Sequence, residues 1–249
     1  SYGIGAIILG SRSGSEGTVE NYGCNGGWDG FRATGNLVRA FNYDAEESAW
    51  TADNINSFDN RAIFYSEGRS LDITTSAIGT FTEEGWAVYK YSNLNSDGTP
   101  GKNTTFPDTD FPLFRLGEVY LMYAEAVARG GEGGSTSKAV EYIQNLRKRA
   151  NTVYSEVTES WLTENTSVSA STASVAYGNI LNERCRELYW EATRRTDLIR
   201  FGLFTSNSYT WAERVGVISG VGVDDKYNLF PIPVSDISVN GNLHQNEGY

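Results

Sequence analysis

Two amphipathic segments joined by a run of glycines constrain the fold of this chain more than any other feature. In PLFRLGEVYLMYAEAVA, residues 112–128, apolar side chains recur at spacings of three and four, and Pro112 stands at a position typical of a first helical turn. These side chains are Leu113, Leu116, Tyr120, Met122, Tyr123 and Val127. The glycines at 130, 131, 133 and 134 end this helix, and Ser135 or Ser137 is suited to cap the next one.

A second helix is expected over residues 137–150. Its apolar stripe is formed by Ala139, Tyr142, Ile143, Leu146 and Ala150. Small residues near the crossing let the two helices approach closely, and a helix, a short glycine turn and a second helix make a tetratricopeptide-like unit. One such unit does not bury its apolar face alone, so further helices must pack on it.

A third helical pattern occupies SVAYGNILNERCRELYWEATRRTDLIRFG, residues 174–202. Its stripe contains Ile180, Leu181, Cys185, Leu188 and Tyr189, and continues past Thr193 with Leu198, Ile199 and Phe201. Gly202 is expected to end it. The Ser/Thr-rich residues 155–174 are typical of a loop or an exposed insertion. The two prolines of LFPIPVSDI favour an extended segment over a helix.

Residues 1–111 have a different character. Short apolar groups such as RAIFYS and WAVYKYS stand between Gly, Asn, Asp, Ser and Thr clusters, which indicates brief strands joined by long loops, with a helix near Asn36. The fold class is therefore mainly α, with tetratricopeptide-like helical hairpins, a large irregular loop-rich region and a few short β-strands. We expect a loop-rich ligand-binding region over 1–111 and a helical region over 112–249, in one continuous domain.

Charge and composition narrow the ligand class. The formal net charge is -11 and the pI about 4.6, so the field of the protein repels nucleic acid and anionic lipid. Aromatic residues make up 13% of the chain, and their flat rings suit the C–H faces of a neutral polyhydroxylated ligand. Cys24 and Cys185 form no disulfide framework and no zinc motif. The apolar run Ile4–Leu9 is too short for a membrane span.

Charged residues on the third helical pattern favour structure over catalysis. Glu183, Glu187 and Glu191 are spaced by four and would repel one another unless cations offset them. The arginines interleaved with them predict a network that holds helices together: Arg184, Arg186, Arg194, Arg195 and Arg200. In the alternative, Glu183 and Glu187 form the acid and base pair of a glycoside hydrolase, but nearby arginines would lower both pKa values.

No catalytic residue, metal site or cofactor is predicted. His244 is the single histidine and stands in a terminal segment, where it lacks a nucleophile partner. Asp and Asn clusters, such as residues 53–59 and the pairs at 108 and 110 and at 224 and 225, do not match the twelve-residue calcium loop. They are interpreted as solvated turns, with a structural Ca²⁺ as the open alternative.

Several stretches carry a family resemblance. They are FRLGEVYLMYAEAVARGG (114–131), YIQNLRKRA (142–150), ILNERCRELYWEATRRTDLIRFG (180–202), and LFPIPVSDI (229–237) followed by NGNLHQNEGY (240–249). Together they resemble the SusD/RagB family of cell-surface nutrient-binding lipoproteins of Bacteroidetes. Upstream, GWDGFRATGNLVRAF (27–41) and the D-x-R turn of DNRAIFYS (59–66) are similar to the same family. Gly117, Ala192 and Glu247 depart from its usual residues.

The resemblance implies a function as well as a fold. Such proteins capture glycans (oligo- or polysaccharides) outside the cell without cleaving them, and dock as a lid on a SusC-like TonB-dependent transporter in the outer membrane. Members of the family are about twice this length, and they begin with a lipidated cysteine and tetratricopeptide-like helices. We therefore expect this chain to be the C-terminal part of such a protein, attached to the membrane only through that absent N-terminus.

Candidate ligand contacts come from the chemistry of the residues, because no glycan-contacting residue carries over from the resemblance. Rings on polar, glycine-rich chain are suited to stack on a sugar, with charged groups at their rim. The candidates are Tyr22, Trp28, Asp29, Phe31 and Arg32, with Trp50 in a second line. In the alternative interpretation, Trp28 points inward as an anchor of the loop. Trp86 and Trp190 are expected to pack, and Trp211 to have a structural place.

Three hypotheses follow for the function. The first is a glycan-binding component of an uptake system, the second a tetratricopeptide-type module that binds a protein or peptide, and the third a hydrolase. A further expectation is that the helices near 113–128 and 180–201 each leave an apolar face uncovered within this chain.

Overall fold

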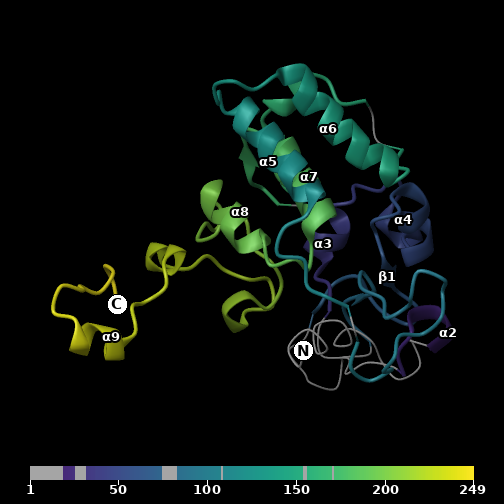
Figure 1. The fold of residues 1–249 in the computed structure, drawn as a ribbon, viewed down its shortest axis with the longest axis horizontal. Helices are drawn as coiled ribbons and strands as arrows, with labels where there is room; N and C mark the ends of the chain where they lie inside the picture. The colour runs from purple at the N-terminus through teal and green to yellow at the C-terminus, as the bar shows by residue number, and fades with distance from the viewer. Residues whose placement is uncertain (1–18, 26–31, 75–82, 108, 154–155, 170) are drawn as a thin grey trace.

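A helical hairpin and the helix packed against it form the helical part of the fold. The computed structural model describes residues 19–25, 32–74, 83–107, 109–153, 156–169 and 171–249. Helices α5 (Leu116–Ala128) and α6 (Thr136–Arg149) run side by side, and α7 (Gly178–Leu188) packs against α5 (Figure 1). Ser135 caps α6, since its Oγ accepts a hydrogen bond from the Lys138 amide at 3.3 Å. The hairpin and its cap are confirmed.

The residues that α5 buries differ in part from the predicted stripe. Pro112 lies outside the helix, whose N-cap is Arg115, and the side chains fully buried against the neighbouring helices are Leu121 and Ala124. Tyr120, Tyr123 and Val127 of the predicted stripe are partly buried and pack against the same cluster. The small residues Gly117 and Ala124 also face inward, so the helices approach closely. The exposed apolar side chains on and just before α5 are Leu113, Phe114, Leu116, Val119 and Met122.

Helix α7 has no such exposed face. From Glu183 to Leu188 every side chain is buried, so the expectation of an uncovered apolar face is confirmed for α5 and wrong for α7. The helical pattern also breaks earlier than predicted. Trp190 and Ala192 adopt φ values of 62° and 61°, in the left-handed region, and α8 (Arg194–Arg200) begins after them. Gly202, with φ 69°, ends α8 as expected.

The loop-rich region contains short elements and most of an aromatic core. These elements are α2 (Val19–Tyr22), α3 (Gly35–Arg39), the 3₁₀ turn η1 (Glu47–Ala49), α4 (Ala52–Phe58), β1 (Phe64–Tyr65) and β2 (Ala87–Val88). Strands β1 and β2 pair antiparallel, with Phe64 opposite Val88. Phe41 packs edge-on against both Phe64 and Tyr189, the residue that follows α7. One buried cluster therefore joins residues from both halves of the chain.

The Ser/Thr-rich segment 155–174 is more structured than expected. Within 155–174 the structure has the turn η3 (Ser160–Leu162) and strand β3 (Thr166–Ser167), which pairs antiparallel with β4 (Ser174–Val175). Val157, Leu162, Val168 and Ala173 are buried, so this segment packs on the helices and is not an exposed insertion. Its isolated apolar residues escaped the prediction because Ser and Thr dominate the composition.

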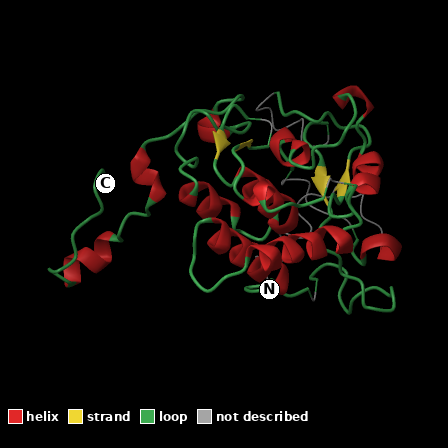
Figure 2. Ribbon diagram, turned by 90° about the horizontal axis from the view of Figure 1, so that it is seen from above, coloured by secondary structure: helices red, strands yellow, loops and turns green. Residues whose placement is uncertain are grey.

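The C-terminal segment extends away from helices α5 to α8 (Figures 1 and 2). It carries the 3₁₀ turns η4 (Arg214–Gly216) and η5 (Asp225–Asn228) and helix α9 (Val234–Val239). The expectation of an extended conformation throughout LFPIPVSDI is wrong, because Pro233 occupies the N-cap of α9, where its missing N–H costs nothing. No helix in the described part of the chain is long and apolar enough to cross a membrane.

A buried ion-pair network fastens the loop-rich region to α7. Asp59 is fully buried, and its Oδ1 accepts a hydrogen bond from the Arg61 amide at 2.9 Å. The Arg61 guanidinium donates to Asp59, to Glu183 Oε1 at 2.8 Å and to Glu187 Oε2 at 3.2 Å. The D-x-R turn therefore docks directly onto the carboxylates of α7.

Cations from four other segments complete this network. Glu183 also accepts from Arg147 and Arg186, and Glu187 from Arg115 at 2.6 Å. Arg149 binds Glu187, and Glu191 binds Arg115 and Lys90. The predicted arginine and carboxylate network is confirmed, but Arg186 is the one arginine of the five predicted that contacts these glutamates among the described residues. Arg184 binds Asp197, and Arg200 binds Glu125 and Asp197.

This network makes the stability of the fold depend on pH. Burial alone would raise the pKa of Glu183 and Glu187, but their arginine partners hold both pKa values below the ordinary 4.5. A carboxyl whose pKa is depressed in the folded state stabilises it above the unfolded pKa and loses this contribution as pH falls. We therefore expect the urea midpoint to drop steeply below about pH 4.5, the ordinary glutamate value. A midpoint that stays constant from pH 7 to about pH 3 would contradict this.

Candidate ligand-binding site

The structure places three of the six predicted contact residues, and it does not gather them into one site. The ring of Tyr22 lies 4.4 Å from that of Tyr89, and Arg32 donates to the Glu84 carbonyl at 2.8 Å. Trp50 lies elsewhere, with its indole N–H donating to the Ala45 carbonyl at 2.8 Å. Trp28, Asp29 and Phe31 lie outside the described residues. All six stay predictions.

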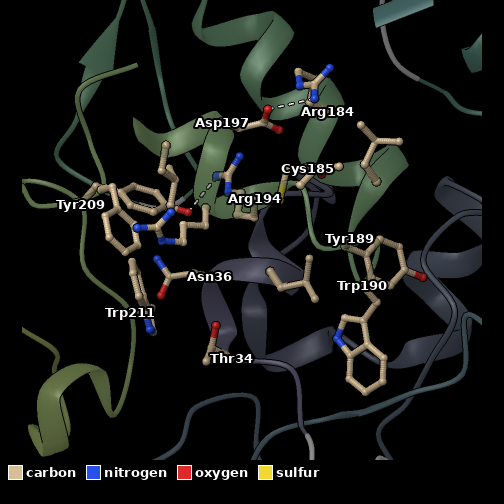
Figure 3. Close-up of a pocket in the computed structure, with 16 residues that line it drawn as sticks. Thr34, Asn36, Arg184, Cys185, Tyr189, Trp190, Arg194, Asp197, Tyr209 and Trp211 are labelled. Atoms are coloured by element: carbon tan, nitrogen blue, oxygen red, sulfur yellow. Dashed lines mark hydrogen bonds and ion pairs between the residues drawn. The ribbon is translucent and has the colours of Figure 1, made fainter. Parts of the chain in front are cut away.

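A cavity of about 300 Å³ lies between α3, the end of α7, α8 and the segment after α8 (Figure 3). Most of its wall is apolar. The apolar and aromatic residues that form it are Leu37, Cys185, Leu188, Tyr189, Trp190, Leu198, Phe204, Tyr209 and Trp211. A concave, mainly apolar pocket with a few polar groups is the usual form of a small-molecule site.

Backbone conformation brings Trp190 to this wall. Its φ of 62° is unusual for a bulky residue, and the turn it makes separates α7 from α8. The Trp190 carbonyl accepts a hydrogen bond from the Tyr91 hydroxyl at 3.1 Å, which holds the turn against the loop-rich region. Strained conformations of this kind concentrate at functional sites. Trp190 packs, as expected, against the buried cluster of Phe41 and Tyr189. The turn was not expected, because the helical pattern continues through residues 189–193.

Trp211 and Tyr209 lie on the side of the view opposite Trp190 (Figure 3). The Arg214 guanidinium stacks on the Trp211 ring at 4.3 Å and so fixes the plane of the indole. Arg194 donates to the Tyr209 hydroxyl at 2.8 Å. Burial alone would lower the pKa of Arg194, but Cys185 and Tyr209 hold it above its ordinary value, so the arginine stays charged.

Two neutral polar side chains from the start of α3 complete the cavity. Thr34 occupies the N-cap of α3 yet forms no capping hydrogen bond with its side chain, so its hydroxyl is available to a ligand. Asn36 donates to the Ser169 carbonyl at 3.2 Å, which leaves its amide oxygen for another donor. Rings on two sides with a hydroxyl, an amide and a guanidinium between them are suited to hold a sugar.

The acid and base pair of the hydrolase hypothesis is not in a cleft. Glu183 is fully buried and bound by three arginines, and its pKa is held well below the usual range. A general acid needs a raised pKa and access to substrate, so this pair is unsuited to cleave a glycosidic bond. Glu187, the other member of the pair, is likewise bound by arginines that hold its pKa below the ordinary value.

The histidine, the two cysteines and the acidic turns are further possible reactive or metal-binding groups among the described residues. His244 is exposed near the C-terminus, and Cys24 and Cys185 are buried free thiols. Asp224 accepts from the Lys226 amide and so caps the turn η5. No cluster of three or more metal-ligating side chains occurs within the ranges that the structure describes.

Comparison with known proteins gives a consistent result. The SusD family model matches residues 10–249. The starch-binding protein SusD of Bacteroides thetaiotaomicron is 42% identical over 210 residues, which cover 83% of this chain and 34% of SusD. This chain therefore spans about a third of that relative's length.

Solved structures agree on the fold. A SusD superfamily protein from Parabacteroides distasonis matches with a TM-score of 0.55 at 21% identity, covering 98% of this chain and 46% of its own. A SusD-like protein from Bacteroides fragilis matches with a TM-score of 0.50 at 19% identity. The match covers 92% of this chain and 50% of that protein. The mainly helical fold class with few short strands is confirmed. From the match over residues 10–249 and the identity to SusD, this chain belongs to the SusD family.

Proposed function

We propose that this chain binds a glycan at the cell surface without cleaving it, as part of a nutrient uptake system of the SusC/SusD type. The observation that carries the proposal is the 42% identity to a starch-binding protein, together with a cavity walled by Trp190 and Trp211. The buried, arginine-bound state of Glu183 and Glu187 supports binding over hydrolysis. Starch, the ligand that the name of this relative gives, is the first candidate.

The cavity supplies contacts of the two kinds that a sugar requires. The fixed indole of Trp211 offers a flat face to C–H groups, and Thr34 and Asn36 offer hydrogen bonds to hydroxyls. Trp28, Asp29 and Phe31 precede Thr34 closely in the chain and remain proposed contacts, as do Tyr22, Arg32 and Trp50.

The proposed partner is a SusC-like TonB-dependent transporter of the outer membrane, on which the protein would act as a lid. Membership of the family supports this partner and the surface location. The exposed apolar side chains Phe114, just before α5, and Leu116 and Val119, on α5, are suited to contact further protein.

Affinity electrophoresis tests the proposal. The chain is run in gels that contain starch, dextran, a β-glucan, a mannan or no polysaccharide, and retardation is measured for each. We expect retardation by at least one neutral polysaccharide, and no increase in reducing ends after incubation in solution. Normal migration in every gel, or release of reducing ends, would contradict the proposal, and binding of unstructured peptides instead would favour a protein-interaction module.

A further inference from the structure

A larger cavity, of about 630 Å³, adjoins the cavity that holds Trp190 and Trp211. We call it the C-terminal cavity, because much of its wall comes from residues at or beyond Val223. Three residues belong to the walls of both cavities: Arg195, Phe204 and Trp211. The two cavities therefore meet at a common boundary, and a ligand that fills the first can extend into the C-terminal cavity.

The aromatic part of this boundary is held in a fixed position. The Arg214 guanidinium lies 4.3 Å from the centre of the Trp211 ring and 5.7 Å from that of Phe204. Arg214 is itself buried, and it donates to the backbone carbonyls of Tyr209 at 3.1 Å and Ser206 at 3.4 Å. Because both rings are packed against an anchored arginine, little ordering is required when a ligand binds beside them.

Arg195 supplies hydrogen-bond donors at the same boundary. Its Nη2 donates to the Tyr227 carbonyl at 2.8 Å, and its guanidinium lies 4.2 Å from the centre of the Phe230 ring and 4.9 Å from that of Phe204. These contacts hold the C-terminal segment against α8. Within the ranges that the structure describes, Arg195 Nε and Nη1 form no hydrogen bond, so both are available to a ligand oxygen.

The C-terminal cavity has aromatic walls like those of the first. Tyr227, Phe230 and Tyr249 line it, and each of these side chains is at least 41% exposed. The Tyr249 hydroxyl donates to the Leu229 carbonyl at 3.0 Å, which ties this ring to the same wall. The Tyr227 hydroxyl forms no hydrogen bond with any described residue. Exposed rings with a few free donors between them are suited to the C–H faces and hydroxyls of sugar units.

We propose that the two cavities form one extended site, in which a glycan occupies the first cavity and continues past Trp211 into the C-terminal cavity. Arg195 donates to a sugar hydroxyl at the boundary, and Tyr227 and Phe230 contact the units that the first cavity does not reach. An apolar protein segment in the same place would leave the Arg195 donors unsatisfied. The inference rests on the proposed function and narrows its ligand class to an oligosaccharide long enough to span both cavities.

Isothermal titration calorimetry with maltotriose and maltoheptaose tests the inference. If a different polysaccharide retards the chain in gels, oligosaccharides of three and seven units from that polysaccharide are used instead. A seven-unit chain can place three consecutive units in a three-unit site in five ways, so length alone raises the apparent affinity about fivefold at most. We expect a gain of about thirtyfold or more, because the added units contact additional rings.

Phe230→Ala shows whether the C-terminal cavity produces this gain. Phe230 is 71% exposed, so its loss leaves the packing of the helices unchanged. We expect the variant to bind the seven-unit ligand about fivefold or more weakly and the three-unit ligand as before. Val239→Ala is the matched control, because it shortens another exposed apolar side chain of the C-terminal segment that lines neither cavity. Circular dichroism verifies that both variants fold.

The outcomes separate this inference from the proposed function. A gain of fivefold or less with length overturns the inference and leaves glycan binding intact, whereas absence of binding by every glycan contradicts both. Unchanged seven-unit affinity in Phe230→Ala overturns the inference, as does an equal loss for both lengths, since the ring then acts only on the first cavity. An equal loss in Val239→Ala also overturns it, because the effect is then not specific to the cavity wall.

Discussion

Replacing Arg61 with methionine is expected to destabilise the fold by about 3–5 kcal/mol, the largest effect of any single substitution considered. Arg61 is buried and contacts three carboxylates, Asp59, Glu183 and Glu187. Methionine fills part of the volume but leaves these charges without their shared partner in a water-poor environment, where an uncompensated charge is costly. Urea denaturation followed by circular dichroism measures the loss.

Arg149→Met is the matched control for this substitution. Arg149 Nη2 binds the same oxygen of Glu187 at 2.6 Å, but 56% of its side chain is exposed to solvent. Since exposed ion pairs contribute little, we expect a loss below about 1 kcal/mol. Equal effects of the two variants would show that burial of the network does not determine its contribution.

Trp211→Ala is expected to weaken glycan binding by about tenfold or more, equivalent to about 1.4 kcal/mol. The substitution removes a ring that Arg214 holds in a fixed plane at the wall of the first cavity. Large aromatic side chains at the centre of a site carry a disproportionate share of binding energy. Affinity is measured by calorimetry with the polysaccharide that retards the chain in gels.

Trp50→Ala provides the comparison. Trp50 is also partly buried, hydrogen-bonds to Ala45 and packs against Tyr43, and it does not line the cavity. Trp50 is also a proposed contact, so this variant separates the two locations: if the cavity alone is the site, Trp50→Ala keeps its affinity. Both variants are compared at temperatures below their melting transitions. Loss of affinity in Trp50→Ala with none in Trp211→Ala would place the ligand in the loop-rich region instead.

The hairpin was predictable because the helical spacing of the apolar residues and the position of the glycine run indicate the same helix boundaries. Ala139, Ile143 and Leu146 repeat at helical spacing and are buried, and the glycines before Ser135 leave one place for the turn. On α5 the same rule was right for Tyr120, Tyr123 and Val127, which pack against the buried cluster, and wrong for Leu113, Leu116 and Met122, which are exposed. Close helix packing instead selected Gly117, Leu121 and Ala124.

The sequence predicted that arginines would pair with the glutamates of α7, but it did not predict which arginines. Glutamates spaced by four on one helix require cations, yet the sequence does not show that Arg61, Arg115 and Arg147 come from three distant segments. Adjacent arginines on α7 point to other partners because a helix turns 100° per residue. Contacts between residues so far apart in the sequence produce no recognisable pattern in either segment.

The walls of two cavities escaped prediction for a related reason. Trp190 lies at the first cavity because two non-glycine residues, Trp190 and Ala192, adopt left-handed conformations that no propensity favours. Thr166 and Ser167 line a second cavity, between α3, α6 and α7, because the β3–β4 ribbon folds back onto α7. Neither feature follows from composition.

The central claim is that this chain holds a neutral glycan and releases it intact. A calorimetric titration with a linear malto-oligosaccharide of seven glucose units, followed by mass analysis of the recovered ligand, tests both parts at once. The account predicts a saturable heat of binding and a ligand of unchanged length. Shortened ligand would contradict it, as would the absence of binding heat for this oligosaccharide and for every neutral glycan of the electrophoresis panel.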